Sequence, residues 1–196
     1  MKMTSTTALA LVAALSATTA FAGGHANWTS VDAQSSVGFA SIKNDSFGEL
    51  HHFSAVTGTV SEAGALNIAI DLSSVETNID IRNERMIEHV FQAGAATATL
   101  TGEIDMAEVS GLAVGDTALV DVEGTLAFVG IETDVETEML VARLGEDRVL
   151  VTTADFILLS TEDLGIDAGI DKLMELASLD GITRVSPVSI RMVFEK

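Results

Sequence analysis

The sequence predicts an all-β protein, a single antiparallel β-barrel of about eight strands with two short helical insertions. Apolar and polar residues alternate with a period of two through most of the chain, as in strands that bury one face. Clusters of Gly, Asn, Asp and Ser separate these runs and mark turns. Acidic side chains fill many of the polar positions, so we expect a charged outer face around an apolar interior.

The clearest alternation lies in two neighbouring runs. Residues 120–128 carry apolar or Gly positions at every second residue, and residues 131–139 do the same with acidic residues between Ile131, Val135 and Met139. The runs meet at Gly130, which predicts a hairpin with one apolar and one acidic face. The same reasoning predicts further strands at 36–43, 51–60, 66–72, 96–104, 149–156 and 188–194. Pro187 begins the last of these, where a missing backbone donor is tolerated.

Two segments depart from this period. Residues 79–91 and 166–179 space their apolar side chains at helical intervals with charges between them, which predicts two short helices. A sheet of eight strands can close on itself, and its interior is then wide enough for one small or slender ligand. Alternation alone leaves two alternatives open, a hollow barrel with an apolar pocket or a filled core.

The first 22 residues predict an export signal. Lys2 precedes an apolar run at 8–17, and Ala20 and Ala22 stand at the small-residue positions of a cleavage site before Gly23. The run is too short to span a bilayer, so we expect residues 1–22 to be removed and residues 23–196 to form the exported domain. A cut after Ala20 is the alternative. Periplasmic localisation follows from this prediction.

Charge and cysteine content exclude several classes of protein. Removal of residues 1–22 leaves nine basic residues against 29 acidic ones, a net charge of −20. Such a surface repels phosphate backbones and anionic headgroups, so we expect neither nucleic-acid binding nor stable membrane insertion. The chain has no cysteine, which rules out disulfides and thiol chemistry.

The mature chain resembles the YceI-like family of exported bacterial proteins over almost its full length. The stretch IDLSSVET at 70–77 is the most specific feature. The other matching features are Trp28, SVGF at 36–39, HFSAVTG at 52–58, IRNERM at 81–86, GTL at 124–126, GIE at 130–132, KL at 172–173 and PVSI at 187–190. The resemblance implies a lipocalin-like barrel that binds a long isoprenoid or similar lipid chain, and a binding protein rather than an enzyme.

This resemblance favours the hollow barrel and directs attention to seven residues. We predict that Phe39, Phe53, Phe128, Met139 and Phe156 form the wall of an apolar tunnel, with Arg82 and Arg85 near its mouth. Guanidinium groups suit a polar lipid head or a diphosphate. The alternative is that both arginines pair with nearby acids and fasten the helix to the barrel; the candidate acids are Glu76, Asp80, Glu84 and Glu88.

The chemistry of the remaining candidates is less specific. His51 and His52 are adjacent on a predicted strand, so they point to opposite faces and do not chelate one metal together. No GxSxG or comparable nucleophile motif is present, so we expect no enzymatic activity. A cut after Ala22 would place Gly23, Gly24 and His25 at a new N-terminus, where an amine, two amide nitrogens and an imidazole form a square that suits Cu(II) or Ni(II).

The expected function is therefore sequestration or transport of a polyisoprenoid, a quinone or a similar lipid, with no required cofactor other than that ligand. The alternative is a metal-binding or interaction module that uses the barrel as a scaffold for the Gly23-Gly24-His25 clasp. A homodimer is compatible with either function.

Overall fold

The computed structural model describes residues 26–92 and 97–196, and the twelve strands of this part of the chain form one antiparallel sheet. The strands are β1 (Ala26–Ser30), β2 (Ser36–Lys43), β3 (Phe47–Phe53), β4 (Val56–Ser61), β5 (Ala65–Asp71), β6 (Val75–Glu76), β7 (Thr97–Glu103), β8 (Thr117–Phe128), β9 (Ile131–Gly145), β10 (Arg148–Thr153), β11 (Ile157–Ser160) and β12 (Val185–Glu195). Two 3-10 turns, η1 (Asp32–Gln34) and η2 (Leu72–Ser74), interrupt the strands.

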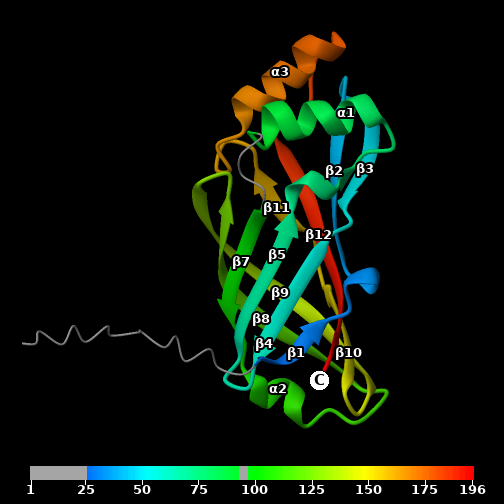
Figure 1. Ribbon diagram of the computed structural model, residues 1–196, viewed down its shortest axis with the longest axis vertical. Coiled ribbons are helices and arrows are strands. Elements are labelled where there is room, and N and C mark those ends of the chain that lie inside the picture. Colours follow the sequence, from blue (N-terminus) through cyan, green and yellow to red (C-terminus); the bar gives the residue numbers. More distant parts are fainter. Residues whose placement is uncertain (1–25, 93–96) are drawn as a thin grey trace, which may run out of the picture.

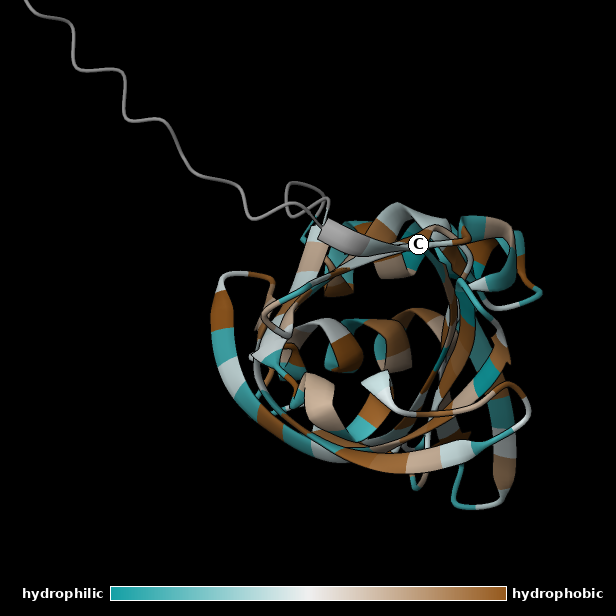
Figure 2. Cartoon of the chain, turned by 90° about the horizontal axis from the view of Figure 1, so that it is seen from below, coloured by the Kyte–Doolittle hydropathy of each residue, from teal (hydrophilic) through white to brown (hydrophobic). Residues whose placement is uncertain are grey.

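Eight of these strands close into a barrel. The first strand, β1, pairs with β4 on one side and with the last strand, β12, on the other. The ring of described strands therefore runs β1–β4–β5–β7–β8–β9–β10–β12 and returns to β1. Figure 2 looks along the barrel from its lower end and shows the strands curving around a common interior. The predicted fold class, an antiparallel barrel of about eight strands, is confirmed.

A second layer of pairing extends the barrel upward in the view of Figure 1. The long strand β12 pairs with β10 through residues 191–195 and with β2 through residues 188–191. Its first residues pair with β11 instead. Strand β2 continues to β3, and β3 to β6. The β2–β3 hairpin therefore forms one wall of the upper part of the molecule.

Helices lie at both ends of the barrel. At the upper end, α1 (Asp80–Arg85) continues into a π-helical turn, η3 (Met86–Val90), and lies beside α3 (Asp167–Ala177) (Figure 1). The backbones of η3 and α3 approach closely at Gly169, where a Cβ atom would lie 2.5 Å from the carbonyl oxygen of His89. At the lower end lies the short helix α2 (Met106–Ser110). The two predicted helical insertions correspond to α1 with η3 and to α3.

The strand predicted at 51–60 is in fact two strands. Phe53 and Val56 are both buried, so the alternation changes phase between them. The backbone of Ser54 donates to the carbonyl oxygen of Ser74, and the backbone of Ala55 donates to the Ser74 hydroxyl. These bonds to η2 replace ladder bonds and turn the chain from β3 into β4.

The strand predicted at 149–156 is too long. Strand β10 ends at Thr153, and a bend at 154–156 separates it from β11. Strands β1, β6 and β11 and helix α2 are elements that the alternation did not predict.

The outer face between β8 and β9 carries opposed acids. Glu123 lies directly opposite Glu136 of β9 on one side and Glu103 of β7 on the other. Asp121 and Glu138 are likewise opposite each other. Like charges directly opposite each other destabilise a sheet. Burial of the apolar side chains inside the barrel must therefore outweigh the repulsion between these carboxylates.

Candidate ligand-binding interior

The barrel interior contains two cavities. The upper cavity, of about 430 Å³, lies beneath α1 and α3 and is lined by residues of β2, β3 and the upper halves of the barrel strands. The lower cavity, of about 240 Å³, is lined by residues of α2 and the lower strand ends, together with the C-terminal Lys196. The upper volume lies within the range of small-molecule sites. The described barrel is therefore hollow and not a filled core.

A chain of four phenylalanine rings forms the apolar wall of the upper cavity. Phe39 stacks on Phe53 with ring centroids 5.3 Å apart, and Phe53 contacts Phe91 at 5.7 Å. Phe91 meets the ring of Phe128 edge-on at 5.9 Å. Because the four residues come from β2, β3, the end of η3 and β8, they connect the β2–β3 hairpin to the barrel strand β8 through aromatic contacts.

The β2–β3 hairpin changes from apolar to charged along its inner face. Its inward-facing cross-strand pairs are, in order toward the upper end, Val37 with Phe53, Phe39 with His51, Ser41 with Glu49, and Lys43 with Phe47. The first three pairs and Lys43 all line the upper cavity. A ligand with an apolar chain and a polar head would meet matching side chains at each level of this hairpin.

His51 is the polar residue nearest to the phenylalanine wall. Only 6% of it is exposed, its ring lies 5.0 Å from that of Phe39, and its Nε2 is 3.0 Å from the Ser41 hydroxyl. Its Nδ1 is buried without a hydrogen-bond partner in the described part of the chain. Burial, and next the positive charge of Arg82, lower the pKa of His51 to about 4. The ring is therefore neutral at physiological pH.

Arg82 reaches from α1 to the hairpin and fastens the helix there. Its Nη1 donates to Glu49 across 2.7 Å, and its Nη2 donates to the carbonyl oxygen of Thr77 across 2.6 Å. Lys43 shares the same carboxylate at 3.1 Å. Burial by itself would raise the pKa of Glu49, but the hydrogen bonds from Lys43 and Arg82 outweigh it and hold the pKa below its ordinary value. Arg82 therefore fastens the helix to the barrel, as the alternative prediction stated. Its partner is Glu49 on the hairpin and none of the four acids named in that prediction.

Arg85 differs from Arg82. It lines the upper cavity, and its guanidinium makes no hydrogen bond or ion pair within the described residues. The charged residues of this lining are Lys43, Arg82, Arg85 and Glu49, so the wall has an excess of positive charge in a chain of net charge −19. Arg85 is the lining cation most available to a bound head group.

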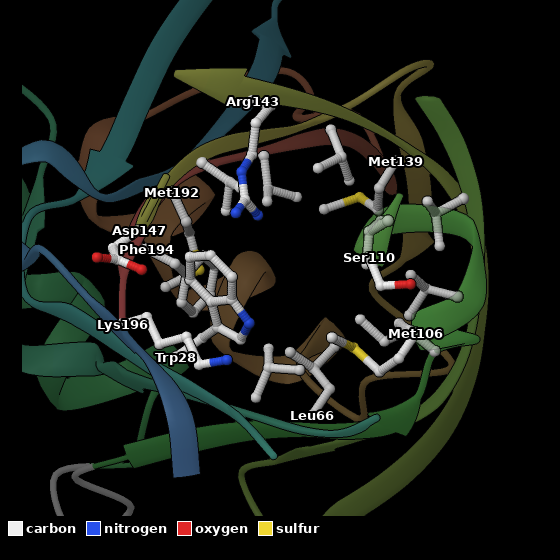
Figure 3. A pocket seen from close by; sticks show the side chains of 18 of the residues that line it. Trp28, Leu66, Met106, Ser110, Met139, Arg143, Asp147, Met192, Phe194 and Lys196 are labelled. Atoms are coloured by element: carbon white, nitrogen blue, oxygen red, sulfur yellow. The ribbon is translucent and has the colours of Figure 1, made fainter. Parts of the chain in front are cut away.

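The lower cavity has a different lining. Figure 3 shows Met106, Met139 and Met192 around it, with the Trp28 ring at one side and Arg143 reaching toward that ring. The guanidinium carbon of Arg143 is 5.2 Å from the Trp28 ring centroid, and Lys196 Nζ is 5.9 Å from it. Thioethers adapt to irregular apolar groups, so this cavity suits a flexible apolar segment.

The structure separates the seven residues predicted for the tunnel. Five of them line the upper cavity: Phe39, Phe53, Arg82, Arg85 and Phe128. Met139 is buried but lines the lower cavity. Phe156 is 68% exposed and lines neither cavity, so its placement on the tunnel wall is wrong. The lining residues of this segment are the odd-numbered Val149, Val151, Ile157 and Leu159, so the even-numbered Phe156 belongs to the outward-facing set.

Several lining residues were missed by the sequence reasoning. Ser41, Lys43 and Glu49 are polar residues on inward positions, where alternation predicts apolar ones. His51 was expected to differ from His52 in its facing, and this is confirmed, since His51 is buried and His52 is exposed. The alternation could have identified these residues, because Ser41, Glu49 and His51 are an even number of positions from Phe39 or Phe53 on the same strand and so share their inward face.

The predicted metal clasp, Gly23, Gly24 and His25, lies outside the described residues and stays a prediction. Among the residues that are described, no group of three or more His, Asp or Glu side chains could hold a metal ion. Within the same ranges, no helix is long and apolar enough to cross a bilayer.

The comparisons with known proteins agree with this architecture. The family model of the YceI-like domain matches residues 28–183. The chain belongs to the YceI-like family. Among solved structures, this YceI-like barrel resembles a polyisoprenoid-binding domain from Saccharophagus degradans, implicated in plant cell wall breakdown, with a TM-score of 0.84 and 37% identity. That match covers 87% of this chain and 98% of the other. We find no match among curated proteins.

Two more distant structures share the YceI-like fold. Burkholderia cenocepacia BcnA aligns with a TM-score of 0.64 and 16% identity, over 84% of this chain and 98% of its own. A Campylobacter jejuni YceI protein aligns with a TM-score of 0.51 and 14% identity, over 80% of this chain and 84% of its own. At these identities the likeness concerns the fold.

Proposed function

We propose that this protein is an exported binding protein that holds a long apolar lipid, a polyisoprenoid or a quinone-type molecule, inside its barrel for sequestration or transport. The observation that carries the proposal is the upper cavity of about 430 Å³, whose wall is mostly apolar and aromatic and whose polar groups gather at one end. Most small-molecule sites combine these two features. The 37% identical Saccharophagus degradans domain, a polyisoprenoid-binding domain, supports the same class of ligand.

The lining suggests how such a ligand would lie. Its chain would contact the rings of Phe39, Phe53, Phe91 and Phe128, and its head would lie toward the upper end of the hairpin. There, the His51–Ser41 pair could donate or accept one hydrogen bond, depending on the imidazole tautomer. Arg85 would supply the positive charge. A neutral carbonyl or hydroxyl head would use the first contact, and an anionic head the second.

Export belongs to the same proposal. A lipid carrier with a surface of net charge −20 after removal of residues 1–22 would stay in the aqueous phase between membranes. N-terminal sequencing of the protein isolated from its native host tests this. A mature chain that begins at Gly23 agrees with it, and a chain that retains residues 1–22 contradicts it.

We also propose that two copies pair through an uncharged strip on the outer face of the upper sheet. Leu50 is 80% exposed and lies opposite Ala40, and Leu158 is 68% exposed and lies opposite Pro187. Because two copies of so acidic a chain repel elsewhere, a face without charge favours a second copy. Sedimentation at several concentrations tests this, with Leu50→Glu expected to give a monomer. A parent chain that is monomeric throughout would contradict the pairing.

Lipid extraction tests the ligand. The protein is purified from its native host without detergent, extracted with organic solvent, and the extract is analysed by mass spectrometry. We expect a stoichiometric isoprenoid-like or quinone-type lipid, recovered in unmodified form. A Phe39→Trp variant, which narrows the upper cavity, should carry less, whereas Phe156→Trp on the outer surface should carry the parent amount. An empty parent protein that also fails to bind added isoprenoid would contradict the proposal.

A further inference from the structure

The two cavities meet at a thin waist inside the barrel. Ile68 lines both of them, and no other described residue does. Along β5 the inward residues pass from Leu66, which lines the lower cavity, through Ile68 to Ile70, which lines the upper one. Along β12 the corresponding step lies between Met192 below and Ile190 above. One layer of side chains therefore separates the cavities.

Gly58, Ile68 and Met192 meet at this waist. Gly58 of β4 lies directly opposite Ile68 of β5. A Cβ atom on residue 58 would lie 2.8 Å from the Cε of Met192 and 3.2 Å from the ring of Phe194. The tip of Met192 therefore occupies the space above Gly58, and only 1% of Met192 is exposed. Since Gly58 has no side chain, Met192 rests on backbone there.

The two side chains at the waist differ in stiffness. Ile68 is β-branched and strongly restricted at χ1. Met192 is unbranched, has three rotatable side-chain bonds and tolerates several packings. Of the two, Met192 is the one that can fold aside without movement of the backbone. Its displacement would join the upper cavity to the methionine-lined lower cavity, where Met106 and Met139 also lie (Figure 3).

We propose that Met192 is a movable plug that determines which chain lengths the barrel accepts. Short apolar chains occupy the upper cavity alone. Long chains displace Met192, cross the waist and place their ends in the lower cavity beside Trp28. This inference rests on the proposed function, because it assigns a specificity-determining residue to the same lipid site.

Trp28 fluorescence can report whether a ligand tail has passed the waist and entered the lower cavity. Trp28 is the only tryptophan, the chain has no tyrosine, and Trp28 lines the lower cavity. A ligand tail that carries a bromine at its far end quenches tryptophan emission only when it comes close. Two probes are used, a short isoprenoid alcohol (farnesol) and a long one (solanesol), each brominated at the tail. Calorimetry measures their binding independently of the quenching.

We expect both probes to bind and only tail-brominated solanesol to quench Trp28. Met192→Phe, which places a rigid ring at the waist, should abolish this quenching and weaken solanesol binding about tenfold or more, because the tail end loses its buried area. Farnesol binding should stay unchanged. The control variant is Leu119→Phe on the outer face of β8, where residue 119 is 54% exposed and lines neither cavity, and this variant should retain the quenching. Met192→Ala, which removes most of the side chain at the waist, should make the quenching by tail-brominated solanesol develop faster than in the parent protein.

Three results would overturn the plug. They are equal quenching by both probes, bound solanesol that leaves Trp28 emission unchanged, or a folded Met192→Phe variant that is quenched like the parent. If neither probe binds the parent protein, the proposed lipid function fails and the plug fails with it. If both probes bind but the quenching of Trp28 does not depend on chain length, the plug is overturned and the proposed lipid function stands.

Discussion

Arg82 on α1 donates a hydrogen bond to Glu49 on β3, with 2.7 Å between Nη1 and Oε2. This contact joins residues 33 positions apart and fastens the helix to the hairpin that lines the upper cavity. Both side chains are mostly buried, with 22% and 24% of their area exposed. The pair is therefore less screened by solvent than an ordinary surface ion pair.

Arg82→Ala should lower the free energy of unfolding by about 1–3 kcal/mol, because Glu49 would be left with one cation and the Thr77 carbonyl would lose its donor. Arg85→Ala, three residues further on the same helix, should change it by less than about 0.5 kcal/mol, since Arg85 has no partner within the described residues. Urea unfolding of both variants measures this. Equal losses in the two variants would contradict the fastening role.

His51 should make stability depend on pH. Its pKa of about 4 lies below the ordinary value of 6.5, so between these values the unfolded chain binds a proton that the folded chain does not. Stability from this group is therefore complete above pH 6.5 and is lost as the pH falls toward 4, by an amount on the order of 3 kcal/mol. Thermal unfolding across this range should show a flatter profile for His51→Gln.

Gly124 should tolerate no side chain. A Cβ atom there would lie 2.5 Å from the carbonyl oxygen of Thr101 on the neighbouring strand, and backbone cannot move aside cheaply. We expect Gly124→Ala to cost about 2–4 kcal/mol of unfolding free energy. Gly48, also in a strand, has nothing within 4 Å of the same position. Gly48→Ala should stay within about 0.5 kcal/mol of the parent in chemical denaturation. If the two variants are equally stable, the strands do not approach as closely as described.

Glu123→Lys should stabilise the barrel. The new cation would face Glu103 and Glu136 directly, so two repulsions become attractions worth about 0.5–1 kcal/mol together. The gain should shrink in high salt because the face is exposed. Glu132→Lys makes the same change in charge opposite Ala127 and should gain less. Melting temperatures of the three proteins at low and high salt decide between these outcomes.

The mature protein should bind one Cu(II) through Gly23, Gly24 and His25 if cleavage follows Ala22. The binding should disappear in His25→Ala and also when one extra residue precedes Gly23, because the amine is then displaced from the square. Calorimetry with Cu(II) measures this on the protein as exported. Unchanged copper binding in both variants would exclude the clasp.

The sequence by itself determined most of the long strands and which of their faces points inward. Alternation at 120–128 and 131–139 predicted the hairpin of β8 and β9, and Phe39, Phe53 and Phe128, which were predicted for the inner wall, do line the upper cavity. Such patterns are local, since each residue's facing depends on its neighbours two positions away. For that reason alternation identifies the inner face of a regular strand. The placement of Phe156 was wrong because the inward residues around it, Val151 and Ile157, are odd-numbered.

Only the tertiary structure decided how the interior is divided and where its polar groups meet. The turn at Ser54 and Ala55 depends on Ser74, and the closure of the ring depends on β1 meeting β12 at the other end of the chain. The waist likewise joins Gly58 to Met192, which are far apart in sequence. Period-two alternation carries no information about such contacts, because it specifies which face a residue occupies but not which residue it will meet there.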